Sequence, residues 1–335
     1  MTSKELAAIL GVSQSTVSRA LNNSDLLSDQ TKAYIRQKAS EYGFVLNSHA
    51  QSLKTNRTGT IGILFPKHFI GMHTNLSLAY LYDLVQKKLR DRGYDVMVVY
   101  DAVDDNGISL FERTIKCHKV DGFIILTLGL DKRDQDLIRK YSVPCVYLLN
   151  AVKSSAQNCS CTSDSEYGGY LAGMHLGSSE DYQPYYIAAC ETADSRSRLN
   201  GYIRGLKEEG RQLPQDHILS CSLSIHSAYD CIMKNKEKFE NTKCAIFAYN
   251  DTLALGVLNA FNVLGLKIPE QIQIAGMDGL PLVAELTPRL TTIELFQDDI
   301  AEMGCDMLKK IIDNKDRKVM QMVIKPKLAK GETTL

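Results

Sequence analysis

Short apolar runs alternate with longer stretches of helical periodicity from Thr60 onward, and this alternation limits the architectures that the chain can adopt. The apolar runs are rich in β-branched and aromatic residues, as in TIGILF, DVMVVY and GFIILT. Strands that alternate with helices form parallel β–α–β units. A second set of such segments extends from YGGYLAGMHLG to IQIAGMD. The sequence therefore predicts an α/β fold with two doubly wound subdomains that face each other across a crevice.

The first part of the chain follows a different pattern, typical of three short helices. Thr2 begins a capping-box pattern, and the helix that follows is expected to end at Gly11. Ser13 can cap a second helix, and a third begins near Ser28 and ends near Gly43. Three helices with a tight turn between the first two predict a helix-turn-helix head.

The second of these helices carries a polar edge formed by Gln14, Ser15, Ser18 and Arg19. Hydroxyl, amide and guanidinium groups suit hydrogen bonds to base edges and phosphates, and one helix fits the major groove. Up to Thr58 the chain has seven basic side chains against four acidic ones, whereas the whole chain has 39 of each. The pattern favours a small DNA-binding head, with an ordinary solvated helix face as the alternative.

The segment ELAAILGVSQSTVSRALNNS, followed by LSDQTKAYIRQKASEYGF, resembles the DNA-binding head of the LacI/GalR family of bacterial repressors over residues 2–59. The resemblance implies that Gln14 and Ser15 select bases and that Ser18 and Arg19 lie beside them in the groove. Helix N-termini favour anions, which suits phosphate binding. Thr2, near the start of the first helix, is therefore expected to hold a phosphate, and by the resemblance so are Ser13, Thr16, Asn22, Ser28 and Thr31.

The segment VLNSHAQSLKTNRTGT joins head to body and is too short to form a stable helix alone. By the same resemblance it becomes a hinge helix that pairs with its twin from a second subunit in the minor groove. Leu53 matches the apolar wedge that opens a base step, and Asn47, Ala50 and Gln51 match its supporting positions. The family pattern PNxxARxL reads LNSHAQSL here, so Leu46 replaces a proline and Gln51 an arginine. A plain solvated linker is the alternative.

Ligands of open α/β sheets bind at the carboxyl ends of the strands, where this chain places several polar residues. Arg198 opens the helix after PYYIAA, Asn250 and Asp251 follow AIFAY, and Asp278 follows IQIAGM. A carboxylate and an arginine together can bind vicinal hydroxyl groups through charge-assisted hydrogen bonds. These residues therefore predict a site for a polyhydroxylated ligand.

The segments RLNGY and AIFAYNDTLALGVLNAFNVLG resemble the effector domain of the same family. The resemblance implies a small effector, most often a sugar, a sugar phosphate or a nucleobase, and adds Asn75 and Asn150 to the candidate site. The family segment NPFF reads NLSL here, and GFDD reads GMDG, so Gly279 stands where a carboxylate is common.

Three parts are expected along the chain. Residues 1–46 form the helix-turn-helix head, 47–58 the hinge helix and linker, and 59–335 the effector-binding and dimerisation domain. The subdomains of that domain are expected at about 59–161 with 292–321 and at 162–291 with 322–335.

Catalytic and metal-binding patterns are absent from the sequence. There is no G-x-S-x-G elbow, G-x-G-x-x-G fingerprint or P-loop, and no histidine pair has metal-ligand spacing. The nine cysteines are scattered without a Cys-x-x-Cys pair, which favours free thiols, with a soft-metal site at Cys159 and Cys161 as the alternative. We expect a protein that is not an enzyme and has no cofactor.

Location and partners follow from the same patterns. No apolar run reaches about 18 residues, and MTSKELAAIL lacks the layout of a signal peptide, so we expect a cytoplasmic protein without a membrane partner. The predicted function is a homodimeric repressor that binds double-stranded operator DNA under the control of a small effector, which we expect to be a carbohydrate. The alternatives are a regulator with a nucleobase or phosphorylated metabolite as corepressor, and a sugar-binding protein without a regulatory role.

Overall fold

The contacts of the computed structural model divide the chain into two compact units, Met1–Gly59 and Thr60–Leu335. The structure describes residues 1–21, 24–44, 57–66, 75–100, 103, 107–127, 130–148, 159–189, 192–314 and 319–335. The candidate residues that lie outside these ranges are Asn22, Asn47, Ala50, Gln51, Leu53 and Asn150.

The first unit contains the predicted three-helix head. Its helices are α1 (Ser3–Leu10), α2 (Gln14–Leu21) and α3 (Asp29–Glu41). The Thr2 hydroxyl accepts a hydrogen bond from the Glu5 amide while the Glu5 carboxylate accepts one from the Thr2 amide, so the capping box is confirmed. The Ser13 hydroxyl accepts from the Thr16 amide at 3.1 Å, and Ser28 caps α3. Local hydrogen bonds therefore fix where each helix begins.

A small apolar core holds the three helices together. Leu6 from α1, Val17 and Ala20 from α2 and Ile35 from α3 are fully buried in one cluster. Helix α2 buries only Val17 and Ala20, so most of its surface faces away from the core.

The second unit contains two six-stranded sheets, which confirms the α/β prediction. The first sheet has the order β11-β5-β4-β3-β1-β2, and the second has the order β12-β10-β9-β8-β6-β7. Neighbouring strands run parallel throughout, except that β12 is antiparallel to β10. The first sheet comprises β1 (Thr60–Phe65), β2 (Asp95–Tyr100), β3 (Gly122–Ile125), β4 (Cys145–Tyr147), β5 (Cys159–Ser163) and β11 (Gln321–Ile324). The second comprises β6 (Gln183–Ala188), β7 (Ile218–Ser220), β8 (Cys244–Ala248), β9 (Ile272–Asp278), β10 (Thr291–Glu294) and β12 (Lys327–Ala329).

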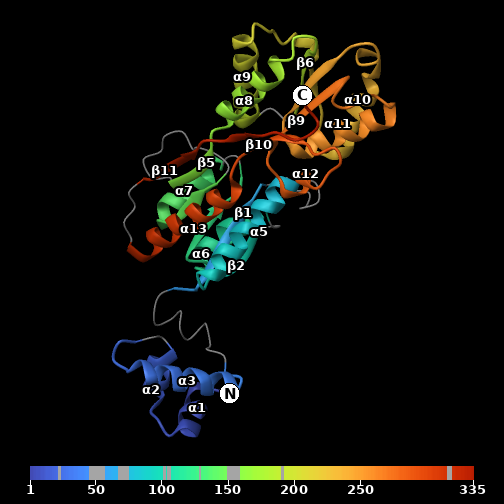
Figure 1. Ribbon diagram of the computed structural model, residues 1–335. Helices are drawn as coiled ribbons and strands as arrows, with labels where there is room; N and C mark the ends of the chain where they lie inside the picture. The colour runs from blue at the N-terminus through green and yellow to red at the C-terminus, as the bar shows by residue number, and fades with distance from the viewer. Residues whose placement is uncertain are drawn as a thin grey trace. The chain divides into compact units, whose positions relative to one another are not determined.

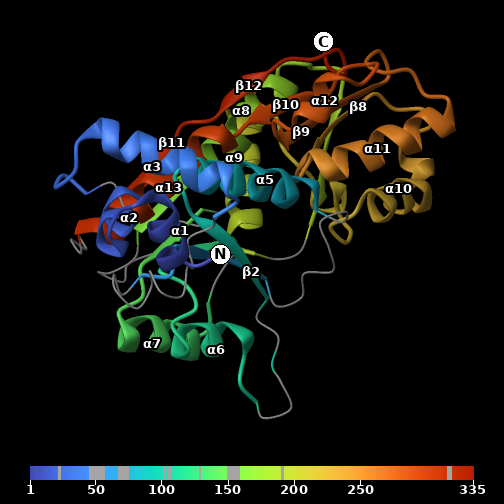
Figure 2. The same cartoon turned by 90° about the horizontal axis from the view of Figure 1, so that it is seen from below.

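Helices cover both faces of each sheet, and each sheet with its helices is here called a lobe (Figure 1). In the first lobe, α5 (Leu76–Asp91) and α13 (Gln297–Asn314) lie on one face, and α6 (Leu110–Lys116) and α7 (Lys132–Tyr141) lie on the other (Figure 2). In the second lobe, α8 (Ser165–Gly177) and α9 (Ala193–Glu208) cover one face, and α10 (Ile225–Lys234) and α11 (Asp251–Leu264) cover the other. The remaining short elements are α12 (Pro281–Ala284), η2 (Gln215–His217) and η3 (Lys236–Lys238). No described helix combines the length and apolar character needed to span a membrane.

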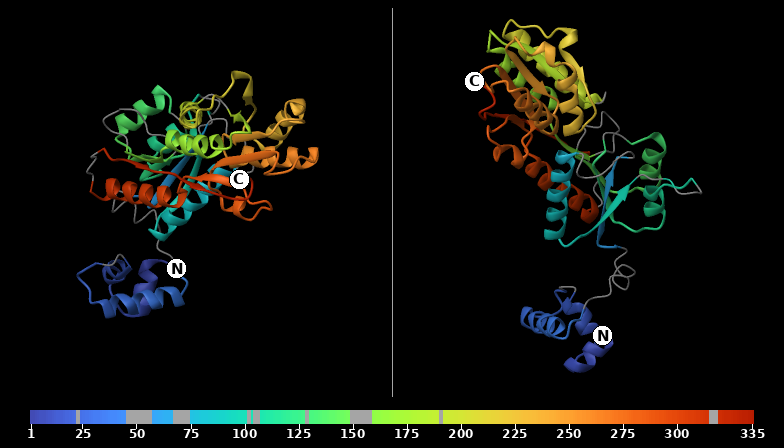
Figure 3. Two further views of the ribbon diagram at one scale, coloured as in Figure 1. Left: turned by 45° about the horizontal axis from the view of Figure 1, so that its top comes forward. Right: turned by 90° about the vertical axis from the view of Figure 1, so that its right-hand side faces the viewer.

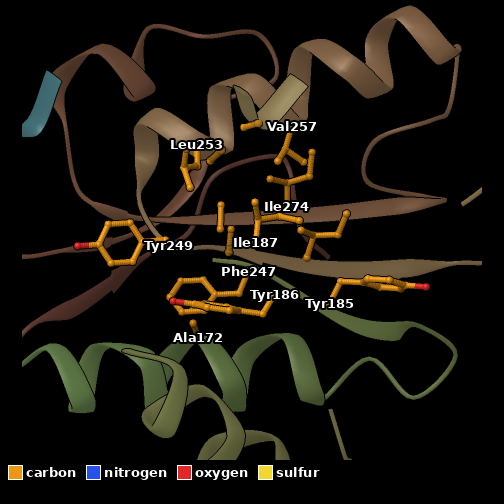
Figure 4. Close-up of a cluster of buried hydrophobic side chains, with 14 of the residues drawn as sticks. Ala172, Tyr185, Tyr186, Ile187, Phe247, Tyr249, Leu253, Val257 and Ile274 are labelled. Atoms are coloured by element: carbon orange, nitrogen blue, oxygen red, sulfur yellow. The ribbon is translucent and has the colours of Figure 1, made fainter. Parts of the chain in front are cut away.

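The core of the second lobe shows how the helices are held on the sheet. Tyr186 and Phe247 point from the strands toward α8, where Ala172 meets them (Figure 4). Leu253 and Val257 of α11 pack on the opposite face. The strands of this sheet are buried on both faces, which explains their nearly continuous apolar sequences.

The chain passes between the two lobes three times, after β5, after β10 and after β11 (Figure 3). The expected boundaries at 161/162, 291/292 and 321/322 fall inside these strands and are therefore a few residues early. The reason is that the last residues of each strand still belong to a ladder. Ser163 pairs with Ile324 in the first sheet, and Glu294 pairs with Asp278 in the second, so the chain crosses only beyond them.

Helices α8 and α9 approach each other at backbone distance because glycines line their contact. A Cβ atom on Gly201 of α9 would lie 1.9 Å from the carbonyl oxygen of Glu166, and one on Gly169 of α8 would lie 2.0 Å from that of Arg198. These atoms belong to the backbone and cannot rotate away. The contact therefore requires glycine at both positions.

We predict that Gly201→Ala destabilises the second unit by about 2 kcal/mol or more, because the added methyl group forces the two helices apart. Thermal unfolding followed by circular dichroism measures the change. Asn200→Ala is the matched control, since Asn200 is exposed on the same helix and should unfold near the wild-type temperature. Equal midpoints for the two variants would show that the helices are not held at this distance.

Candidate functional site

The buried guanidinium group of Arg198 lies at the carboxyl end of the second sheet. Its Nη1 atom donates to the Tyr249 carbonyl oxygen at 2.7 Å and lies 3.4 Å from Asp278 Oδ1. Its Nε atom lies 2.9 Å from Asp194 Oδ2, and its Cζ atom lies 4.4 Å from the centroid of the Tyr249 ring. Arg198 and Asp278, both predicted from their positions at strand ends, are therefore brought together.

Asp194 and Tyr249 are components of this cluster that the sequence analysis did not single out. The Ser165 hydroxyl donates to Asp194 Oδ1 at 2.5 Å, and the Tyr249 hydroxyl donates to Oδ2 at 3.1 Å. Tyr249 is labelled in Figure 4, where its ring lies at the edge of the apolar cluster. The i,i+4 spacing of Asp194 and Arg198 on one helix is a local signal that could have identified the pair.

Asp278 is wholly buried, and one of its oxygens has no partner. Its Oδ2 atom makes no hydrogen bond to the described part of the chain, and neither does Gln297 Oε1. The Gln297 amide donates to the Ser77 hydroxyl at 2.7 Å, and burial raises the pKa of Asp278 while the Ser77 hydroxyl partly offsets that rise. Because Ser77 belongs to α5 and Gln297 to α13, both lobes contribute to the surroundings of Asp278.

The electrostatics of this cluster combine one cation with several carboxylates. Burial works against the charge of Arg198, but Asp194, Tyr249 and Asp278 more than offset it and raise the pKa of the guanidinium group. Burial raises the pKa of Asp278 to about 6, although Arg198 opposes that shift. The site therefore holds a permanently charged donor beside a carboxyl group that is costly to ionise.

Asp251 lies at the start of α11 with both oxygens bound inside the protein. Oδ2 accepts a hydrogen bond from the Leu280 amide at 2.8 Å, and Oδ1 accepts one from the Thr292 hydroxyl at 2.5 Å. The Thr292 oxygen in turn accepts from the Gly279 amide at 3.3 Å. We infer that Asp251 positions the turn after Asp278, whereas the sequence analysis predicted that it contacts the effector.

That turn has an unusual backbone. Asp278 has φ 134° and Gly279 has φ 70°, both in the region that favours glycine. A Cβ atom at Gly279 would lie 2.8 Å from Glu294 Cα, which accounts for glycine at a position where the family often has a carboxylate. The Gly279 and Leu280 amides donate to Thr292 and Asp251, and these bonds hold the backbone after Asp278 in this strained geometry.

The asparagines of the candidate site serve as helix caps. Asn75 Oδ1 accepts from the Leu78 amide at 3.0 Å and begins α5, and Asn250 Oδ1 accepts from the Leu253 amide at 3.0 Å and begins α11. Each oxygen is therefore engaged by its own helix. The side-chain amide groups are the parts of Asn75 and Asn250 that remain for another contact.

In the head, the polar edge of α2 lies on its outer surface. Gln14, Ser15 and Arg19 are exposed, whereas Thr16 and Ser18 are partly buried. The Gln14 amide donates to the Ser3 hydroxyl at 2.9 Å, and the Ser13 hydroxyl lies 2.7 Å from that of Ser15. These bonds fix the direction of the first turn of α2.

The remaining phosphate-binding candidates of the head lie at helix N-termini. Thr2 and Ser28 are N-caps, and the Thr31 hydroxyl lies 2.8 Å from that of Ser28. Thr2 and Ser28 are exposed, and Thr31 is partly buried.

A metal site finds no support in the described residues. None of them form a group of three or more histidine, cysteine, aspartate or glutamate side chains that could hold an ion. Cys159 and Cys161 are buried in the apolar core of the first lobe. The soft-metal alternative for this pair therefore lacks ligands within the described chain.

We predict that Asp251→Asn removes part of the pH dependence of stability. Burial and the nearby Asp278 raise the pKa of Asp251 to about 7, well above the roughly 3.9 of an unfolded aspartate. Between these values the folded protein binds the extra proton, so wild-type stability falls as the pH rises. Relative to the variant, the wild type should lose about 2–3 kcal/mol of unfolding free energy from about pH 5 to about pH 8.

Urea unfolding of both proteins across this pH range measures the difference. Titrating groups remote from Asp251, such as His175, whose pKa is lowered by burial, are common to both proteins and cancel. A difference that stays constant with pH would contradict the raised pKa of Asp251.

Comparisons with known proteins match both units of the chain. Residues 2–47 match the family described as bacterial regulatory proteins, lacI family, and residues 185–334 match the periplasmic binding protein-like domain. A transcriptional repressor named PurR from Vibrio vulnificus is 27% identical over 329 residues, covering 96% of this chain and 95% of the relative. The ribose operon repressor of Escherichia coli is 26% identical over 308 residues, covering 92% of each chain.

Among solved structures, the lac repressor dimer bound to operator and the anti-inducer ONPF has a TM-score of 0.79 at 22% identity, covering 100% of this chain and 99% of that one. At this identity the likeness shows the fold. Together with the two matched domains and the relatives that span nearly the whole sequence, it leads to one assignment. The chain belongs to the lacI family of bacterial regulatory proteins.

Proposed function

We propose that this chain is a homodimeric repressor that reads a pseudo-palindromic operator through α2 and responds to a neutral, polyhydroxylated effector. The observation that carries the DNA-binding role is the exposed polar edge of α2. Local hydrogen bonds orient this edge, and burial of Val17 and Ala20 fixes the opposite side of the helix. The relatives compared above are transcriptional repressors, which supports a regulatory role without catalysis.

In this proposal Gln14, Ser15, Ser18 and Arg19 lie in the major groove. Arginine forms bidentate hydrogen bonds to guanine, and glutamine does so to adenine. The proposed phosphate contacts lie at helix N-termini or on the first turn, where backbone amides favour anions. They are Thr2, Ser13, Thr16, Ser28 and Thr31, together with Asn22. The roles of the hinge residues Asn47, Ala50, Gln51 and Leu53 rest on the family resemblance alone.

We predict that Arg19→Ala weakens binding to the operator by about 10-fold or more, the cost of one lost base contact. Fluorescence anisotropy measures the affinity on an operator selected by the wild-type protein from random double-stranded DNA. Arg36→Ala is the matched control, because it removes the same charge from an exposed position of α3. If both variants lose affinity equally on operator and on random DNA, Arg19 contributes charge but does not read a base.

The homodimer is supported by apolar side chains on the surface of the second lobe. Val263 near the end of α11 is 65% exposed, and Leu282 on α12 is 49% exposed. Symmetric dimers bury the same patch on both subunits. Two heads held by one dimer match the two half-sites of a palindromic operator.

The proposed effector site is the cluster around Arg198 and Asp278. Asp278 Oδ2 and Gln297 Oε1 are buried acceptors without partners in the described chain, so a ligand there should bring hydrogen-bond donors. Asp194 and Asp278 both pair with Arg198, and Asp251 lies near Asp278, so the carboxylates outnumber the one arginine, which disfavours a phosphorylated ligand. Sugar hydroxyl groups supply donors without adding charge, and a ribose operon repressor is among the relatives.

Two further candidates extend the proposed site. Asn75 and Asn250 contribute through their side-chain amide groups. The place of Asn150 in the site rests on the family resemblance alone. Asp251 acts on the effector only through the turn that holds Asp278.

We predict that a neutral sugar raises the thermal midpoint of the wild-type protein and that Asp278→Asn abolishes this response. Asparagine tolerates positive φ, so the variant should keep the turn. Differential scanning fluorimetry with neutral sugars, sugar phosphates and purine bases measures the effect, which corresponds to about 2.7 kcal/mol at a ligand concentration of about 100 Kd. Glu285→Gln, at an exposed position after α12, should keep the full response. A midpoint raised only by sugar phosphates or purines would contradict the proposed ligand class.

A further inference from the structure

We propose that Cys221 and Cys231 form a peroxide-sensitive dithiol that closes to a disulfide beside β7. This inference is independent of the proposed function, because it concerns the chemistry of two side chains in the second lobe. The eight described cysteines are all free thiols. Two of them come from neighbouring elements and meet.

The geometry places the Cys231 thiol beside the peptide that leads into Cys221. Cys221 directly follows β7, and Cys231 lies on α10. Cys231 raises the pKa of Cys221, and Cys221 lowers that of Cys231, as expected of neighbouring thiols. Cys231 Sγ also lies 3.9 Å from the carbonyl oxygen of Ser220, the residue before Cys221. A disulfide between them therefore requires only local movement of neighbouring side chains.

The surroundings distinguish this pair from the other buried thiols. Cys221 lowers the pKa of Cys231, and the nearby Lys234 acts in the same direction. Burial instead raises the pKa of Cys161 to about 11 and that of Cys244 to about 12. Since the thiolate is the reactive form, Cys231 is the nucleophile of the pair. Cys221 is partly exposed, which gives a small oxidant access to the site.

The reaction with hydrogen peroxide balances in two steps. The Cys231 thiolate attacks one peroxide oxygen, and the O–O bond breaks. Cys231 becomes a sulfenic acid, and hydroxide is the leaving group. The Cys221 sulfur then attacks the sulfenic sulfur, the S–O bond breaks, and water leaves with the proton of Cys221. With the hydroxide protonated by solvent, two thiols and one peroxide give one disulfide and two waters.

The bond would constrain a defined part of the second lobe. It closes a ring over residues 221–231, which contains the β7–α10 connection and the first turns of α10. Cys221 also contacts the end of β6, since its amide donates to the Ala188 carbonyl at 3.0 Å and its thiol lies 3.7 Å from the same oxygen. Oxidation removes the proton that the Cys221 thiol shares with Ala188. The oxidised protein should therefore differ from the reduced one in local hydrogen exchange across this ring.

The experiment treats the reduced full-length protein with a small excess of hydrogen peroxide and maps its disulfides by non-reducing peptide mass spectrometry. We expect a peptide pair joined through Cys221 and Cys231 that dithiothreitol separates. Cys117→Ser is the matched control, because Cys117 is exposed and its loss should leave the joined pair unchanged. Slower hydrogen–deuterium exchange over residues 221–231 should accompany the bond.

Two single variants test the order of the steps. With Cys221→Ser, the sulfenic acid on Cys231 has no partner and should be trapped by dimedone, whereas Cys231→Ser should leave Cys221 unlabelled. Circular dichroism verifies that both variants are folded. A disulfide to any other cysteine, or no disulfide at a peroxide dose that oxidises Cys117, would overturn the proposal.

Discussion

The buried guanidinium group of Arg198 imposes the main electrostatic constraint on the second lobe. A charge that has left water must be paired and hydrogen-bonded, and here Asp194, Asp278 and the Tyr249 carbonyl supply the partners. These partners come from α9, from the end of β9 and from the residue after β8. The close contact of α8 and α9 also serves this arrangement, because Gly169 leaves room for the carbonyl of Arg198 itself. The close packing of α8 on α9 and the ion pairs of the guanidinium group therefore both constrain the position of Arg198.

The turn after β9 shows how the protein maintains a strained group beside that charge. Asp278 keeps a positive φ because the next two residues are tied to Asp251 and Thr292. Asp251 is costly to bury, and its two internal hydrogen bonds reduce that cost. Asp251, at the start of α11, thus serves to fix the backbone of the turn after β9. The carboxylate that remains with a free acceptor is Asp278, which makes it the better candidate for ligand contact.

The parts of the fold that the sequence predicts are those with a strong local pattern. TIGILF becomes β1 over the same residues, and the caps at Thr2, Ser13 and Ser28 begin the three helices of the head. β5 was not predicted, because CSCTS consists of small polar residues and cysteines and has no apolar strand pattern. It forms a strand by pairing with β4 and with the distant β11. In the site, Arg198 and Asp278 follow from strand ends. Ser77 and Gln297 could not be predicted, because they reach Asp278 only through the contact between the lobes.

The contact between the lobes connects the site around Asp278 to the first lobe. Leu76 and Tyr80 of α5 pack against the core of the second lobe, although α5 belongs to the first. Ser77 on the same turn contacts both Gln297 and Asp278. A ligand that binds Asp278 therefore acts on a group that already joins the two lobes, and it will favour whichever lobe arrangement leaves that carboxylate best satisfied. By reciprocity, any partner that prefers one lobe arrangement must change the affinity for the ligand by the same factor. The proposed control of DNA binding by a small molecule could therefore begin at Asp278, because this proposed ligand-binding carboxylate also contacts Ser77 of the other lobe.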